Sequence, residues 1–204
     1  SPTAAIVEAM QEIGRMGRKA EQNLRLSMEA FFDGDQSKID QVYQTEKYID
    51  YLSHEITDYL VDVNQRQLPV ADSLKIGGLF HVVNDIERIG DHAENMAQYS
   101  IRMHKNKERF SKTAMEELRG LVDIIERIYK EAYAQMVSPD QDKYAHVYAL
   151  KRDVNRMIED MKEKHIVRMN KGKCNSQQGM MFVELLMDLE RVAAHAMNIA
   201  QAAN

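Results

Sequence analysis

The residues best suited to chemistry are two pairs of acids, Glu46 with Asp50 and Glu87 with Asp91, each spaced by four positions. This spacing places both side chains of a pair on one face of an α-helix, about one turn apart. Two facing helices would then bring four carboxylates together. Such an oxygen-rich cage suits Fe(III), Mn, Mg or Ca, with Zn also possible. We therefore expect a metal site here.

Two further side chains lie one helical turn beyond these pairs. His54 follows Asp50 by four positions, and Glu94 follows Asp91 by three. Both are candidates for additional ligands, because they would extend the same two helix faces.

Helical periodicity runs through the whole chain and supplies the elements that would carry these pairs. Apolar residues recur at steps of three and four, which is typical of amphipathic helices packed in a bundle. The first predicted helix ends at residues 33–35. The others are expected from about Ser37 to before Pro69, from about Asp72 to His104, up to Ser138, up to residues 170–172, and around residues 183–200.

An internal repeat organises these helices. Residues 85–98 match residues 188–201 at eight of fourteen positions, 103 residues apart, and each copy lies on the last helix of a triplet. We interpret the chain as an all-α tandem duplication of an antiparallel three-helix bundle. The predicted units are residues 1–108 and 109–204.

The two copies keep one column of polar residues and lose another. The column that is identical in both, predicted to be architectural, is Asp85, Arg88, His92 and Asn95, with Asp188, Arg191, His195 and Asn198. The column that changes is Asn84, Glu87, Asp91 and Glu94, whose counterparts are Met187, Glu190, Ala194 and Met197.

This one-sided loss of acids indicates that the changing column faces protein. Inward-facing carboxylates are costly unless a cation neutralises them. On the second helix, Glu46 and Asp50 correspond to Lys151 and Asn155. The first repeat should therefore bind metal, while the second retains a degenerate site with Glu190 alone.

Composition and motifs exclude several other functions. A net charge of −5 argues against a nucleic-acid partner, and Cys174, the single cysteine, allows neither a disulfide nor a thiolate zinc finger. No apolar run is long enough to span a bilayer. No phosphate-binding loop, nucleophile elbow or Glu-x-x-His motif is present, so we expect no enzymatic activity.

Residues 85–97 closely resemble the signature of the PhoU family, and residues 188–200 resemble its second, degenerate occurrence. The resemblance covers essentially the whole chain. It implies two three-helix bundles, a regulatory and non-enzymatic role in phosphate uptake, and Glu-x-x-x-Asp motifs that hold iron or zinc. Carried over by position, the implied ligands are Glu46, Asp50, Glu87 and Asp91.

The resemblance leaves the protein context open. Residues 2–10, 45–50 and 79–85 look like the cytoplasmic tail of a bacterial sodium-dependent phosphate cotransporter, and the chain does not begin with Met. We therefore expect such a tail, at the cytoplasmic side of the inner membrane, with the transmembrane transport domain of the same chain as its partner.

Two alternatives stay open beside the tail. One is a stand-alone PhoU that works with a phosphate ABC transporter and a sensor kinase. The other is a metal-free helical interaction module. A second copy of the chain, forming a homodimer, is a further candidate partner.

Overall fold

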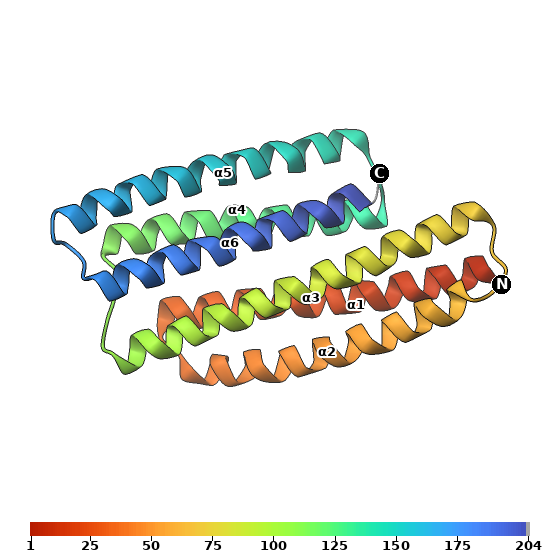
Figure 1. Ribbon diagram of the computed structural model, residues 1–204, viewed down its shortest axis with the longest axis horizontal. Helices are drawn as coiled ribbons and strands as arrows, with labels where there is room; N and C mark the ends of the chain where they lie inside the picture. The colour runs from red at the N-terminus through yellow and green to blue at the C-terminus, as the bar shows by residue number, and fades with distance from the viewer. Residues whose placement is uncertain (203–204) are drawn as a thin grey trace.

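The computed structural model describes residues 1–202 and shows six long helices in this range (Figure 1). All six predicted helices are present and the chain breaks where expected. The helices are α1 (Pro2–Asp33), α2 (Gln36–Asn64), α3 (Val70–Lys105), α4 (Lys112–Val137), α5 (Gln141–Asn170) and α6 (Ser176–Ala202).

Local capping explains the sharp turn between α1 and α2. Gly34 ends α1 in the left-handed region, at φ 70°, where a side chain would be strained. Asp35 then caps α2 by accepting a hydrogen bond of 3.0 Å from the Ser37 backbone N–H. Asp140 caps α5 in the same way, through the backbone N–H groups of Asp142 and Lys143.

The helices form two antiparallel three-helix bundles, α1 to α3 and α4 to α6, as predicted (Figure 1). The central helices α3 and α6 lie against each other, and α1 also contacts α4. The expected boundary after residue 108 falls in the connection between α3 and α4. The second unit was predicted to end at residue 204, and its last two residues lie outside the described residues.

The predicted apolar stripes form the core, with one exception. Ile49, Ile86 and Leu189 illustrate the rule, since each is fully buried. The exception is Val183, where the apolar pattern of the last predicted helix begins: it is 36% exposed, because its neighbours Phe182 and Leu185 take the core-facing positions. None of the helices within residues 1–202 combines the length and the hydropathy that crossing a membrane requires.

The polar column shared by both repeats joins the two bundles through reciprocal hydrogen bonds. Asp188 of α6 lies 2.7 Å from His92 Nδ1 of α3 and accepts a hydrogen bond of 3.1 Å from Asn95. In the mirrored arrangement, Asp85 of α3 lies 2.9 Å from His195 Nδ1 of α6. The architectural interpretation of this column is therefore confirmed for its acids, histidines and amides.

Of the remaining residues of the shared column, the amide takes part in this hydrogen-bond network and the two arginines do not. Asn198 donates to Asp85 at 3.2 Å, whereas the two arginines of the column, Arg88 and Arg191, are exposed. The rings of His92 and His195 stack with their centroids 5.8 Å apart, so the two halves of the network meet at the centre of the interface.

Asp188 is the more heavily bonded of the two acids. Burial by itself would raise its pKa, but hydrogen bonds from His92, Tyr99 and Asn95 outweigh burial and hold the pKa below its ordinary value. The Tyr99 hydroxyl donates to Asp188 Oδ2 at 2.6 Å. The ionised carboxylate is thus the form that the interface between the bundles stabilises.

Substituting Asp188→Asn should lower the free energy of unfolding by about 2 to 4 kcal/mol, because three donors lose an ionised acceptor in a buried place. Urea denaturation followed by circular dichroism measures this. The exposed carboxylate of Asp62, 3.2 Å from Arg66, provides a control, and Asp62→Asn should cost less than about 0.5 kcal/mol. Equal effects of the two substitutions would show that the network contributes no special stability.

Candidate metal centre

Three of the predicted ligands meet where α2 packs on α3. Glu46 and Asp50 of α2 and Asp91 of α3 each offer one carboxylate oxygen, and these oxygens lie within 4.8 Å of one another. The spacing of four positions within α2 aligns its two acids along one face, as expected. Helix packing supplies the third oxygen.

Glu46 is the most constrained member of this group. It is only 5% exposed, and neither of its carboxylate oxygens has a hydrogen-bond donor within the described chain. Buried carboxylates are normally paired or hydrogen-bonded. A proton or a cation is therefore required to neutralise this side chain.

Gly90 of α3 makes room for the Glu46 carboxylate. A Cβ added at residue 90 would lie 2.6 Å from Glu46 Oε2, closer than such atoms approach. The corresponding residue of the second repeat is Ala193, opposite a lysine rather than a glutamate. This role of Gly90 was not predicted, although the exchange of glycine for alanine between the two copies was a signal that could have revealed it.

The electrostatics of the group follow from burial and like charge. Burial, the Asp50 charge and the proximity of Asp91 raise the pKa of Glu46 to about 8. Burial, followed by the charges of Glu87 and Asp91, also raises the pKa of Asp50. Burial, Asp91 and Asp50 raise the pKa of Glu94. A cation at this place would relieve all three groups at once.

The remaining predicted ligands lie beside the three-oxygen group. Glu87 is half-buried at the same interface and accepts a hydrogen bond of 2.9 Å from Ser53 Oγ of α2. Glu46 and Glu87 therefore both face the contact between α2 and α3. His54 is exposed and close enough to Asp50 to oppose the rise in its pKa.

The changing column does not face inward along its whole length, contrary to our expectation. Asn84 is exposed and Glu87, Asp91 and Glu94 are half-buried. In the second repeat, Met187 and Ala194 are exposed as well, whereas Met197 is buried. The column lies at the edge of the contact with α2, and only Glu46, from the opposite helix, reaches full burial.

In the second repeat, neutral and cationic side chains stand at the positions of the acidic group, namely Lys151, Asn155 and Ala194. Lys151 Nζ donates to Asn155 Oδ1 at 2.6 Å. Burial lowers the pKa of Lys151, and the nearby carboxylate of Glu190 opposes this change. Glu190 also lies 3.9 Å from Lys162 Nζ. Glu190 is thus a single, partly exposed acid with two lysines nearby, so this half has no comparable demand for a cation.

The donor set of the first repeat fits a metal ion. Glu46, Asp50 and Asp91 would hold it through carboxylate oxygens, with Glu87 and Glu94 on the same helix face for additional contacts. Oxygen donors favour hard cations such as Fe(III), Mn or Mg and also accept Zn. Metal binding by these residues stays a prediction, supported by the unsatisfied oxygens of Glu46.

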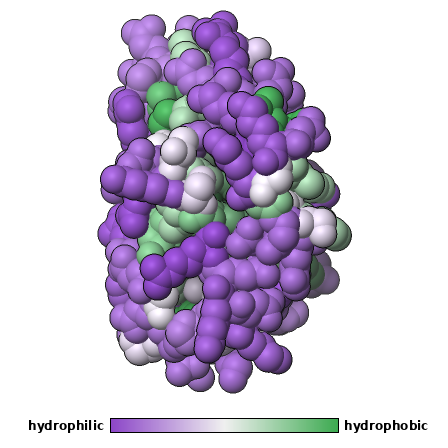
Figure 2. Space-filling view, turned by 90° about the vertical axis from the view of Figure 1, so that its left-hand side faces the viewer, coloured by the Kyte–Doolittle hydropathy of each residue, from purple (hydrophilic) through white to green (hydrophobic). Residues whose placement is uncertain are grey.

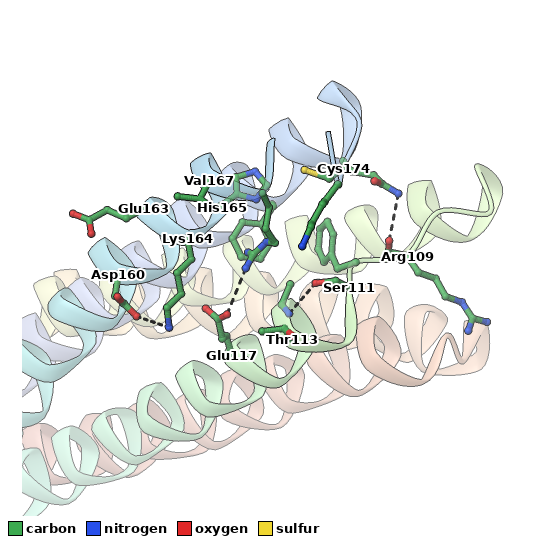
Figure 3. A pocket seen from close by; sticks show the side chains of 16 residues that line it. Arg109, Ser111, Thr113, Glu117, Asp160, Glu163, Lys164, His165, Val167 and Cys174 are labelled. Atoms are coloured by element: carbon green, nitrogen blue, oxygen red, sulfur yellow. Dashed lines mark hydrogen bonds and ion pairs between the residues drawn. The ribbon is translucent and has the colours of Figure 1, made fainter. Parts of the chain in front are cut away.

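A pocket of about 800 Å³ lies in the second bundle, between the ends of α4, α5 and α6 (Figure 3). Its residues are far in the sequence from the acidic group of Glu46, Asp50 and Asp91. Four of the pocket's charged side chains form two pairs, Lys164 with Asp160 at 3.0 Å and Arg168 with Glu117 at 3.5 Å. The buried ring of His165 stacks on Phe182. No sequence motif indicated this pocket, because its lining comes from several separated segments.

Figure 2 shows the end of the molecule where α3 connects to α4, with hydrophobic residues exposed in a recess among hydrophilic ones. Phe110, in this connection, lines the pocket of Figure 3 and also a second pocket that includes Phe31 and Phe32. The buried carboxylate of this region, Glu117, has the Arg168 guanidinium 3.5 Å away, whereas Glu46 has no cationic side chain within ion-pair distance in the described chain.

The Glu46 carboxylate should make the metal-free protein less stable as the pH rises. Between the ordinary pKa of 4.5 and the folded-state value of about 8, the unfolded chain ionises Glu46 while the folded chain keeps it protonated. The melting temperature of Glu46→Gln should therefore move increasingly above that of wild type from pH 5 to pH 8, reaching about 5 °C, and level off at higher pH.

Calorimetry of both proteins in the presence of a chelator measures this difference. A gap that stays constant over the whole range would contradict the raised pKa. A gap that shrinks with rising pH would have the wrong sign for a buried carboxylate.

Gly90→Ala should weaken metal binding without unfolding the helix, because the new methyl group displaces the end of a flexible side chain. We expect the affinity for Mn²⁺, measured by isothermal calorimetry, to fall roughly tenfold or more, as when groups supporting a metal ligand are altered. Gly78→Ala on the same helix is the matched control, since an added Cβ there meets nothing within 4 Å. Equal affinities of the two variants would remove Gly90 from the site.

The family model described as the PhoU domain matches this chain twice, over residues 13–100 and 118–203. Among named relatives, the phosphate-specific transport system accessory protein PhoU homolog 1 of Thermotoga maritima is 22% identical over 93% of this chain and 82% of its own length. A homologue of the same description from Pseudomonas aeruginosa is 24% identical over 97% and 81%, respectively.

Solved structures show the same fold. The crystal structure of PhoU from Pseudomonas aeruginosa superimposes with a TM-score of 0.92 at 24% identity, covering 100% of this chain and 97% of that one. The phosphate transport system regulatory protein PhoU from Streptococcus pneumoniae reaches 0.87 at 15% identity, covering 100% and 95%. Because the family model matches both three-helix units, the chain belongs to the PhoU family.

Proposed function

We propose that this chain regulates phosphate transport, as an accessory protein that contacts components of a phosphate transport system. Membership of the PhoU family supports this role, as do the names of relatives that align over nearly the whole chain. Those relatives are accessory proteins, so they favour a PhoU-type adaptor over the transporter tail. The tail rests on the resemblance of three short passages alone. In either context the regulator would act at the cytoplasmic face of the membrane.

The observation that carries the proposed mechanism is the buried, unpartnered carboxylate of Glu46. When a metal is bound, it supplies a positive charge shared by acids from two helices. Glu46 and Asp50 would then hold α2 against Asp91 of α3. In the absence of metal, a proton on Glu46 removes one negative charge, but the remaining acids repel across the same contact.

Helix α3 connects this site to the rest of the molecule. Asp91 lies on its metal-binding side, and the next residue, His92, bonds to Asp188 of the other bundle. A change in how α2 packs on α3 would therefore reach the contact between the two bundles. Regulation through this contact needs no catalytic group.

The test replaces Glu46 with Gln in cells whose own copy of the gene carries the change. Wild-type cells should take up labelled phosphate at different rates after growth in phosphate-rich and phosphate-poor media, and we expect this ratio to approach one in the variant. Elemental analysis of the protein, purified without chelator, should show metal in the wild type and at least roughly tenfold less in Glu46→Gln.

Glu190→Gln, in the degenerate half, is the matched control and should change neither measurement. If Glu46→Gln lost metal and left the uptake ratio unchanged, the metal would have no regulatory role. If wild-type protein contained no metal, the rival interpretation of a metal-free interaction module would replace this one.

A further inference from the structure

A groove of about 430 Å³ lies between α1 and α2. Its floor is apolar, formed by Ala9, Leu52 and Ile56, all of which are buried. Its walls combine aromatic rings with acids, namely Tyr48, Tyr51, Tyr59, Glu8, Glu12 and Glu55. Arg15 is the only basic residue of the lining.

Two of the tyrosines are exposed to an unusual degree for large aromatic side chains. Tyr48 is 38% and Tyr51 is 57% exposed, and their rings stack 6.3 Å apart. Neither is needed to cover the core, because Leu52 and Ile56 already do so. Exposed aromatic residues gathered beside a groove indicate a contact surface.

The groove is specific to the first repeat. In the register that pairs Glu46 with Lys151, the three tyrosines correspond to Asp153, Arg156 and Lys164. The second bundle therefore forms the same helix pair with charged, solvated residues at these positions. The aromatic lining is an addition of the first bundle, and the fold does not require it.

The chemistry of the lining selects a cation. Aromatic faces attract positive charge through their quadrupole, and carboxylates add direct attraction. The chain itself gives one example, since Lys19 Nζ lies 5.8 Å from the centroid of the Tyr48 ring. Acidic lipid surfaces and nucleic acids would be repelled by the same glutamates.

Tyr59 joins the two helices that line the groove. Its hydroxyl donates a hydrogen bond of 3.0 Å to Glu8 Oε2 and so links α2 to α1. The volume falls in the range of pockets that take small ligands, about 300–1,000 Å³, so it accommodates side chains and not a whole domain.

We propose that this groove docks an arginine-bearing segment of a partner protein. Glu12 already lies 3.8 Å from Arg15, and Lys19 lies over Tyr48. An incoming guanidinium can stack on the exposed ring of Tyr51 and pair with Glu55 in the same position, which a more strongly hydrated ammonium does less well. The partner's apolar side chains would rest on Leu52 and Ile56. The inference does not depend on metal binding, because none of these residues belongs to the acidic group on the other side of α2.

The test uses a fluorescent alanine-rich helical peptide with arginine at every fourth position, and anisotropy is measured in the presence of a chelator. We expect saturable binding to the wild-type protein. Tyr51→Ala and Glu55→Gln should each raise the dissociation constant about fivefold, whereas Tyr51→Phe, which keeps the ring, should bind like wild type. Circular dichroism confirms that the variants are folded.

Arg156→Ala, at the place equivalent to Tyr51 in the second repeat, is the matched control and should not weaken binding. Absence of binding, equal binding by wild type and Tyr51→Ala, or equal binding of a peptide with glutamine in place of arginine would overturn the proposal. A second copy of this chain could also occupy the groove, and analytical sedimentation tests this. Self-association that requires Tyr51 would identify the second copy as the occupant and contradict the proposal. None of these outcomes bears on the metal content of the purified protein. The docking proposal and the metal-binding proposal can therefore be rejected independently of each other.

Discussion

The burial of carboxylates at the two contacts that α3 makes, with α6 and with α2, is the constraint on which this structure depends. An ionised acid removed from water needs donors or a positive charge. On the side facing α6, Asp85 and the reciprocal Asp188 obtain donors from histidine and amide side chains of the opposite bundle. On the side facing α2, Glu46 obtains none within the described chain. One helix therefore carries a satisfied polar interface and an unsatisfied one.

The duplication makes the significance of this difference visible. Both copies keep the residues that join the bundles, since each half of the interface needs the other. Only the first copy keeps a group of acids between its second and third helices, whereas the second copy retains Glu190 alone and has Lys151 bonded to Asn155 there. A purely structural requirement would act on both copies equally. The acidic group is present in one repeat and lost from the other, as expected for a site whose function is separate from the stability of the fold.

Helix α2 belongs to two proposed surfaces at once. Glu46 and Asp50 face α3, while Tyr48 and Tyr51, on another side of the same helix, line the groove beside α1. Packed interfaces shift between discrete arrangements and do not deform continuously. A change in the charge of the acidic group would thus act on the same helix that offers the aromatic surface, and through α3 on the contact between the bundles.

The sequence by itself determined the six helices, the tandem repeat and the acid pairs, because these depend on periods of three and four residues within single helices. It also indicated that Asp85 and His92 are architectural, since both copies retain them. Only the tertiary structure decided that Glu46 is fully buried against Gly90, that Glu87 instead bonds to Ser53, and that three tyrosines and three glutamates share a groove. These facts arise where two helices meet, and the angle and register of that meeting are set by packing of the whole core.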